Sequence, residues 1–250
     1  MKKGLYLTLK SKHLVYFSSV FLVLILFSWL LFTGKTVTTG NISTVYPVII
    51  IDAGHGGGDG GTQSASGILE KDINLDISKK LKVILEKSGF RTVMIREDDR
   101  MIHDDNCTTV RSKKTSDLHN RLEIMKSYPG CIFLSIHQNH FSESKYSGAQ
   151  VFYRPGHTES KNLAECIQKS IVSEIQNENT RQIKACTSDV FLIYNAVSTA
   201  VMVECGFLSN EKEAELLNDS KYRERMASAI MHGLTDYLCN KDVNLYGKQN

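Results

Sequence analysis

Short β-branched runs alternate with amphipathic helical stretches from residue 48 to residue 239, and this alternation constrains the fold more than any other feature. It is typical of an α/β domain, in which helices flank a parallel or mixed sheet. We see no internal repeat in this range and no boundary of a second domain. The sequence therefore predicts a single α/β domain whose mixed sheet is mainly parallel.

The expected strands are short apolar runs at residues 48–51, 91–95, 132–136, 149–153, 190–194 and 200–203. Apolar residues four positions apart predict helices over about residues 72–87 and 160–176, a short helix that carries Leu118, Leu122 and Met125, and a helical C-terminus. Gly89 follows the first of these helices, where a glycine commonly ends a helix. Residues 98–115 are polar and are expected to form a loop.

The N-terminal part has a different character from the rest. Residues 14–34 carry no charge and are apolar almost throughout, and about 20 such residues span a bilayer as a helix. Lysines precede this run, and residues 33–40 contain no Ala-x-Ala cleavage site, which favours an uncleaved signal anchor over a cleaved signal peptide. Residues 1–13 are then expected as a cytoplasmic tail and residues 35–46 as a linker. The remaining chain is expected outside the membrane, or secreted if the signal is cleaved.

The charge distribution and the cysteine content exclude one class of partner and one class of metal site. Residues 1–46 carry five of the 30 basic residues and none of the 27 acidic residues, so the remainder holds 25 basic against 27 acidic residues. A slightly acidic body lacks the basic face that phosphate neutralisation requires, which excludes nucleic acid as the main partner. Six cysteines without a Cys-x-x-Cys pair exclude a thiolate zinc knuckle. Cys131 and Cys205 lie in apolar runs and are expected to be buried free thiols.

Three predicted strands end in polar residues that a plain sheet does not need: IIIDAGH at 49–55, FLSIHQN at 133–139 and VMVECGF at 201–207. In open α/β sheets the functional crevice lies beyond the carboxyl ends of the strands. His55, His137 and Glu204 are therefore expected to converge there. The glycine-rich loop would bring Glu70, at the start of the first helix, over the same edge. Two imidazoles and a carboxylate are a typical catalytic zinc set, and a second carboxylate can serve as general base.

Each of these residues has a simpler explanation when taken alone. Glu70 can be an acid that stabilises a helix N-terminus, and Glu204 can pair with an arginine. His140 lies three residues past His137, close enough in sequence to contact His137 without itself binding the metal. The loop also matches Gly-x-Gly-x-x-Gly. However, the next helix starts about ten residues later and Asp59 adds negative charge, so we exclude a dinucleotide site.

Four segments, in order, are similar to the zinc-dependent N-acetylmuramoyl-L-alanine amidase family of the Amidase_3 type: IIIDAGHGGGDGG at 49–61, EKD at 70–72, SIHQN at 135–139 and VECGFLSNEKE at 203–213. The resemblance covers about residues 47–239, the expected catalytic domain, and leaves residues 240–250 as a C-terminal tail. It implies that Zn²⁺ is bound by His55, Glu70 and His137, with Glu204 as the catalytic carboxylate. The implied reaction hydrolyses the amide between the lactyl group of N-acetylmuramic acid and L-alanine in peptidoglycan. Asn139 and His140 are candidates for contacting the substrate or supporting the ligands.

The short anchor, the segment SGAQVFY at 147–153 and the charged loop RSKKTSDLHNR at 111–121 resemble the germination-specific members of this family in endospore formers. That resemblance implies action on spore-cortex peptidoglycan, after which a partner deacetylase allows muramic-δ-lactam to form. It places the domain on the cell-wall side of the membrane or in the forespore intermembrane space. Access of the enzyme to peptidoglycan would be controlled by its location or by a partner, such as an activator or a lipoprotein.

Two alternatives to the cortex role stay open at this point. One is a vegetative amidase that acts in cell separation, and the other is an inactive, membrane-tethered binding protein. The pair Arg181-Gln182 stands where many members of the family have Arg-Gly, a departure that bears on substrate preference rather than on catalysis.

Overall fold

The computed structural model describes residues 20–22 and 46–246, and the part from Tyr46 onward forms one compact unit. Residues 20–22 are helical. The predicted cytoplasmic tail, the rest of the anchor and nearly all of the linker lie outside the described residues. Within the described ranges, no helix combines the length and the apolar character that crossing a membrane requires.

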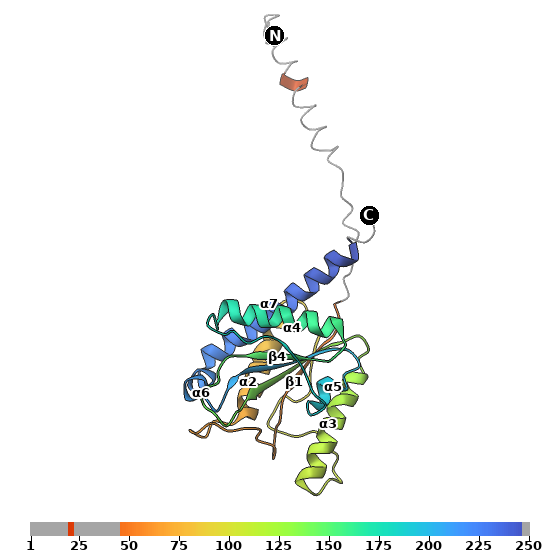
Figure 1. The fold of residues 1–250 in the computed structure, drawn as a ribbon. Helices are drawn as coiled ribbons and strands as arrows, with labels where there is room; N and C mark the ends of the chain where they lie inside the picture. Colours follow the sequence, from red (N-terminus) through yellow and green to blue (C-terminus); the bar gives the residue numbers. More distant parts are fainter. Residues whose placement is uncertain (1–19, 23–45, 247–250) are drawn as a thin grey trace, which may run out of the picture. The chain divides into compact units, whose positions relative to one another are not determined.

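Six strands form one sheet in the order β2-β1-β3-β6-β4-β5 (Figure 1). Their bounds are β1 Ile49–Ala53, β2 Thr92–Met94, β3 Ile132–Asn139, β4 Gln150–Tyr153, β5 Lys184–Ala185 and β6 Thr199–Phe207. β2, β1, β3 and β6 are parallel, whereas β4 runs antiparallel to β6 and parallel to β5. The prediction of one α/β domain with a mixed, mainly parallel sheet is confirmed.

Alternate residues of each strand face two separate apolar cores, as the period of a strand requires. In β1, Ile49 and Ile51 pack into the core beneath α2 (Glu70–Lys87), α4 (Thr158–Glu174) and α7 (Ser220–Tyr246). Ile50 faces the opposite core, which α3 (Val110–Lys126) and α5 (Phe191–Tyr194) cover. Figure 1 shows α4 and α7 together on one side of the sheet and α3 and α5 on the other. The short helix α6 (Glu211–Asn218) follows β6 and precedes α7, whose range includes residues 240–246 of the predicted tail.

The predicted strand at residues 190–194 is wrong, because residues 191–194 form the helix α5. The amide of Tyr194 donates to the carbonyl of Val190 at 3.0 Å, which closes a helical turn. Leu192 and Ile193 are both buried although they are adjacent in the chain. A short apolar run fits a buried strand and a buried helical turn equally well, so periodicity could not separate the two.

The predicted loops at 98–115 and 111–121 are wrong from residue 110 onward, because α3 begins at Val110. Thr109 caps this helix: its side-chain oxygen accepts from the Ser112 amide, and Ser112 Oγ accepts from the Thr109 amide, each at 3.1 Å. This reciprocal capping box supplies partners for backbone amides that the first helical turn leaves free. Charged residues on an exposed helix face were mistaken for a loop.

Two smaller predictions are confirmed. Gly89 has a φ of 87° and ends α2, with its amide bonded to the Glu86 carbonyl at 3.0 Å. Cys131 and Cys205 are buried and free. The strand β5 and the helix α6 had no expected counterpart in the sequence.

Candidate active site

His55 follows β1 and holds an uncommon left-handed backbone conformation, with a φ of 62°. Nη2 of Arg121, on α3, donates to the His55 carbonyl oxygen at 2.8 Å and steadies that conformation. Oδ2 of Asp59 lies 2.9 Å from Nδ1 of the imidazole. Gly56 and Asp59 exchange two backbone hydrogen bonds of 2.9 Å, which turn the loop so that this carboxylate returns to the ring. His55 is therefore held from both its backbone and its side chain.

The structure brings His55, Glu70 and His137 together. Oε1 of Glu70 lies 3.3 Å from Nε2 of His55 and 2.9 Å from Nδ1 of His137. One donor atom from each of the three residues lies within 4.8 Å of the others. The second carboxylate oxygen, Oε2, accepts from the Thr62 amide at 2.8 Å, which fixes the orientation of Glu70 at the start of α2.

Two glycines leave the space that this cluster occupies. A Cβ at Gly54 would lie 2.2 Å from Nε2 of His137, and a Cβ at Gly61 would lie 2.5 Å from Oε2 of Glu70. Real Cβ atoms do not approach so closely, so a side chain at either position would displace one of the three donors. The glycine-rich loop thus allows Glu70 to reach the sheet edge, as the sequence predicts.

The electrostatics of the cluster favour positive charge between its donors. Burial acts to raise the pKa of Glu70, but hydrogen bonds to His137 and His55 outweigh it and hold that pKa well below its usual range. Burial acts to lower the pKa of His55, but the carboxylates of Asp59 and Glu70 outweigh it and raise that pKa to about 9. Two imidazoles and one carboxylate that together attract a cation fit the donor set of a catalytic zinc ion.

Glu204 lies beside this cluster, on the face of the sheet that α3 and α5 cover. In the parallel ladder of β3 and β6 it pairs with His137. Its Oε2 atom is buried and has no hydrogen-bond partner among the described residues. Burial raises the pKa of Glu204 to about 7. A carboxyl group that titrates near neutral pH can both accept and return a proton in a reaction.

Asn139 and His140 lie at the end of β3, and their predicted roles stay predictions. Asn139 is half-buried, and its carbonyl accepts from the Leu208 amide at 2.9 Å. His140 is exposed. Neither side chain has a hydrogen bond within the part of the chain that the structure describes.

Sequence reasoning missed the residues that hold the loop after β1. Arg96 and Arg121 are each only 1% exposed. Nε of Arg96 donates to the Ala53 carbonyl at 2.8 Å, and Nη1 of Arg121 lies 2.5 Å from Oδ1 of Asp52. Nε of Arg121 also pairs with Asp117 at 2.7 Å, one helical turn earlier in α3. That four-residue spacing of opposite charges was the only signal in the sequence for this buried group.

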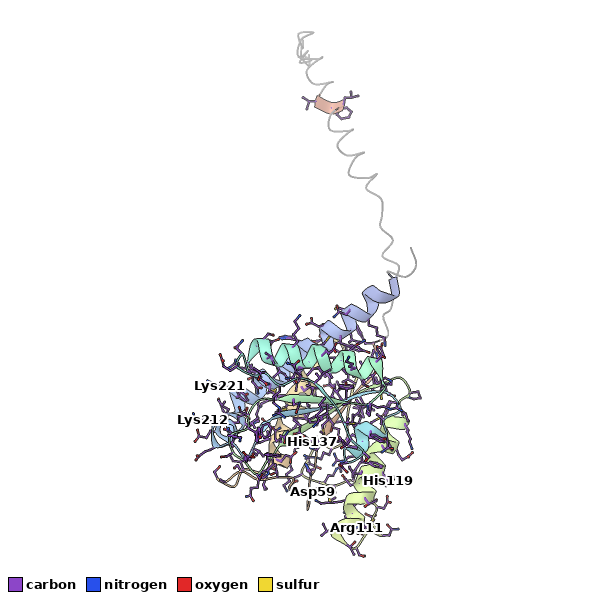
Figure 2. The ribbon with its side chains drawn as sticks, in the orientation of Figure 1. Asp59, Arg111, His119, His137, Lys212 and Lys221 are labelled. Atoms are coloured by element: carbon purple, nitrogen blue, oxygen red, sulfur yellow. The ribbon has the colours of Figure 1, made fainter. Side chains whose placement is uncertain are left out.

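A hollow on the α3 and α5 side borders the cluster and is the candidate cleft for a substrate. Its lining is Asp52, Gly54, His55, Asp59, Lys114, Asp117, Leu118, Arg121, His137 and Leu192. Figure 2 labels His137 and Asp59 in the domain, with His119 and Arg111 along α3.

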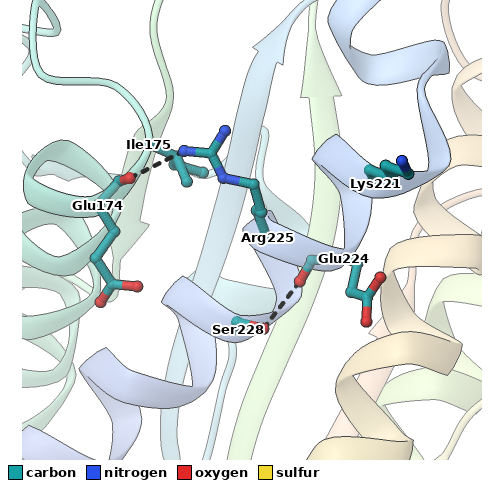
Figure 3. Close-up of a pocket in the computed structure, with 6 residues that line it drawn as sticks. All are labelled: Glu174, Ile175, Lys221, Glu224, Arg225 and Ser228. Carbon is teal, nitrogen blue, oxygen red and sulfur yellow. Dashed lines mark hydrogen bonds between the residues drawn. The ribbon is translucent and has the colours of Figure 1, made fainter.

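A separate pocket lies between α4 and α7 and shares no residue with the cluster (Figure 3). There Nη2 of Arg225 donates to the Glu174 carbonyl at 3.1 Å, a contact that ties the two helices together. This pocket presents none of the candidate metal ligands.

Comparison with known proteins gives one consistent family. Residues 49–236 match a family model described as N-acetylmuramoyl-L-alanine amidase. The chain is 30% identical over 232 residues to the germination-specific N-acetylmuramoyl-L-alanine amidase of Bacillus subtilis (strain 168), covering 93% of this chain and 97% of the relative.

Two solved structures show the same fold. The CwlD amidase from Clostridioides difficile, solved in complex with the GerS lipoprotein, is 42% identical with a TM-score of 0.75, covering 78% of this chain and 99% of that chain. The N-acetylmuramoyl-L-alanine amidase from Clostridium difficile 630 is 30% identical with a TM-score of 0.69, covering 79% of this chain and 100% of that chain.

Proposed function

The chain belongs to the N-acetylmuramoyl-L-alanine amidase family, and from that premise we propose that it is a zinc-dependent amidase of the spore cortex. Its activity is hydrolysis of the amide between N-acetylmuramic acid and L-alanine in peptidoglycan. The observation that carries the zinc proposal is the convergence of one donor atom from each of His55, Glu70 and His137 within 4.8 Å.

His55, Glu70 and His137 would hold the ion. When bound, zinc supplies a Lewis acid that polarises the lactyl carbonyl and makes water more acidic. Asp59 would orient His55 through the contact at Nδ1, which leaves Nε2 to face the cluster. Glycine at positions 54 and 61 would keep the donors in their places.

Glu204 would act as the general base and then as the general acid. Its carboxylate would accept a proton from the attacking water and return that proton to the alanine nitrogen as the C–N bond breaks. The pKa of about 7 supports this role, because the same group must be basic in one step and acidic in the next. Its position beside His137 in the ladder supports it as well, since side chains paired across a ladder project to the same face of the sheet.

The cortex role, the partners and the location are supported by relatives rather than by the site. The similarity to a germination-specific amidase covers nearly the whole of both chains. The complex of the CwlD amidase with the GerS lipoprotein supports a lipoprotein partner for this chain. We further propose that a muramic-acid deacetylase follows this enzyme. Residues 14–34 would anchor the chain, with the domain on the cell-wall side or in the forespore intermembrane space.

Deleting the gene in the organism that carries it separates the cortex role from the vegetative alternative. We expect normal vegetative growth and spores whose muropeptides lack muramic-δ-lactam. Complementation with the wild-type gene should restore the lactam, whereas complementation with Glu204→Gln should not. Chained, unseparated cells with an unchanged spore cortex would contradict the cortex role and favour the vegetative one.

A further inference from the structure

A row of polar side chains crosses three neighbouring strands on the face of the sheet that α3 and α5 cover. His137 of β3 pairs with Glu204 of β6, and Glu204 pairs in turn with Gln150 of β4. Residues paired directly across a ladder project to the same face of a sheet. The row therefore leads from a proposed zinc ligand, past the proposed general base, to Gln150.

Arg181 lies at the Gln150 end of this row. Its Nη2 donates to Oε1 of Gln150, and its guanidinium carbon lies 4.9 Å from the centre of the Phe207 ring. Gln150 is fixed in turn, because its Nε2 donates to the Gln182 carbonyl at 2.7 Å. The Arg181 amide donates to Oδ1 of Asn179 at 2.9 Å. Backbone and side-chain contacts thus hold the guanidinium in one place.

The hydrogen bonds of this arginine are incomplete. Its Nε is buried and has no partner in the part of the chain that the structure describes, and the same is true of Oε2 of Glu204. Within the described residues, Arg181 also forms no salt bridge. Buried polar atoms without partners are rare and costly, so two of them along one row indicate a site that a ligand completes. A planar guanidinium held against an aromatic ring matches a carboxylate in both charge and shape.

We propose that Arg181 binds a carboxylate of the stem peptide and thereby gives the enzyme a preference for acidic peptides. The inference rests on the proposed function, because the row begins at a proposed zinc ligand. Neighbouring strands lie about 4.8 Å apart, so Gln150 stands about 10 Å from His137 across the sheet. An extended peptide covers that distance in about three residues. The carboxylate therefore belongs to a residue that follows L-alanine.

The test uses the zinc-loaded full chain and two synthetic muramyl tripeptides. One tripeptide has free carboxylates beyond L-alanine, and in the other the same carboxylates are amides. We expect the wild type to prefer the acidic substrate, with the difference in KM. Arg181→Gln should raise KM for the acidic substrate by about 10- to 100-fold and leave KM for the amidated substrate near that of the wild type. Any change in kcat should be the same for both substrates, because the Arg181 charge also acts on the Glu204 carboxyl. Arg181→Lys should recover part of the loss because it keeps the charge.

Lys221→Met is the matched control, since it also removes one positive charge, but from an exposed residue beside the pocket between α4 and α7 (Figures 2 and 3). It should keep the substrate preference.

Calorimetric binding of the released acidic tripeptide gives a readout without turnover, and Arg181→Gln should weaken that binding by a similar factor. Absence of hydrolysis by the wild type would reject the proposed function. The binding measurement would still test whether Arg181 binds a carboxylate of the peptide, because it does not depend on turnover. Equal KM values for both substrates in the wild type, a KM that rises equally for both in Arg181→Gln, or unchanged tripeptide binding would overturn the inference.

Discussion

Asp59 shows how a single side chain outside the ligand set can decide the behaviour of a ligand. One carboxylate oxygen faces Nδ1 of His55 at 2.9 Å, and the other pairs with Nζ of Lys114 at 2.7 Å. A carboxylate behind a histidine fixes the tautomer of the ring and increases its basicity as a metal ligand. Asp59 therefore links a proposed zinc ligand to Lys114 of helix α3.

Asp59→Asn should weaken zinc binding by about 10- to 100-fold, because the amide keeps the size of the side chain but removes the charge behind His55. Competition with a coloured chelator measures this affinity directly. Lys114→Met is the control, because Lys114 is about half exposed and contacts Asp59 rather than His55. Its effect on zinc affinity should be much smaller. Unchanged zinc affinity in Asp59→Asn would show that this carboxylate does not support the site.

The candidate site residues were predictable from their shared places at the ends of predicted strands, whereas the role of Asp59 was not. His55 follows β1, and His137 and Glu204 lie near the carboxyl ends of β3 and β6, where α/β sheets gather polar groups. The function of Asp59 depends on the paired backbone hydrogen bonds with Gly56 that turn its side chain back toward the ring. The sequence alone shows Asp59 only as a negatively charged residue in a glycine-rich loop.

At the scale of elements, β1 and α3 meet through a buried group of charges. Arg121 of α3 pairs with Asp52 of β1 at 2.5 Å and with Asp117 of its own helix at 2.7 Å. Burial acts to raise the pKa of Asp52, but the Arg121 guanidinium and the Ser135 hydroxyl outweigh it and hold that pKa below its ordinary value. This group fixes α3 against the strand that leads into His55.

Asp52→Asn should lower the free energy of unfolding by about 3 kcal/mol at pH 7, because it removes one of the two charges that compensate buried Arg121. The folded pKa of Asp52 is depressed, so its contribution is present above the unfolded value of about 4 and is lost as pH falls through the folded value. Urea unfolding at pH 7 and at pH 3 should therefore show a smaller difference between variant and wild type at pH 3.

Glu123→Gln on the same helix is the control for this measurement. Its salt bridge to Lys126 is exposed, so its loss should change stability little at either pH. A difference for Asp52→Asn that is absent at pH 7, or that grows on acidification, would contradict the stabilising role of the buried pair.

Helices and strands with several apolar repeats were predicted correctly, and the errors fall on short or polar segments. The strand β3 and the helix α2 have long, regular patterns. The helix α5 spans four residues, too few for a period to appear. The prediction of a short helix that carries Leu118, Leu122 and Met125 is confirmed by the second half of α3, whereas the start of α3 at Val110 depends on the capping box at Thr109 and Ser112. The direction of β4 could not be predicted either, because alternation along a strand carries no information on which way its neighbour runs.

At the scale of the whole molecule, the proposed division into anchor and catalytic domain has a direct consequence. If residues 14–34 only deliver the domain and hold it at the membrane, a chain of residues 36–250 should fold, bind zinc and release peptides from isolated peptidoglycan. Circular dichroism, zinc content and muropeptide release measure these three properties, with the full chain in detergent as the control. Loss of folding in the shortened chain would mean that the apolar run packs against the domain.

The central claim is that three residues hold zinc and a fourth moves the proton, and replacing one residue of each kind tests it most directly. Zinc content and turnover are measured together in the wild type, His137→Ala and Glu204→Gln. We expect roughly one zinc per wild-type chain and a large loss of zinc in His137→Ala. We expect Glu204→Gln to keep its zinc and its fold while its turnover falls by about 10²- to 10⁴-fold. A wild type without zinc and without turnover, or a Glu204→Gln variant that loses its zinc or keeps wild-type turnover, would contradict the account.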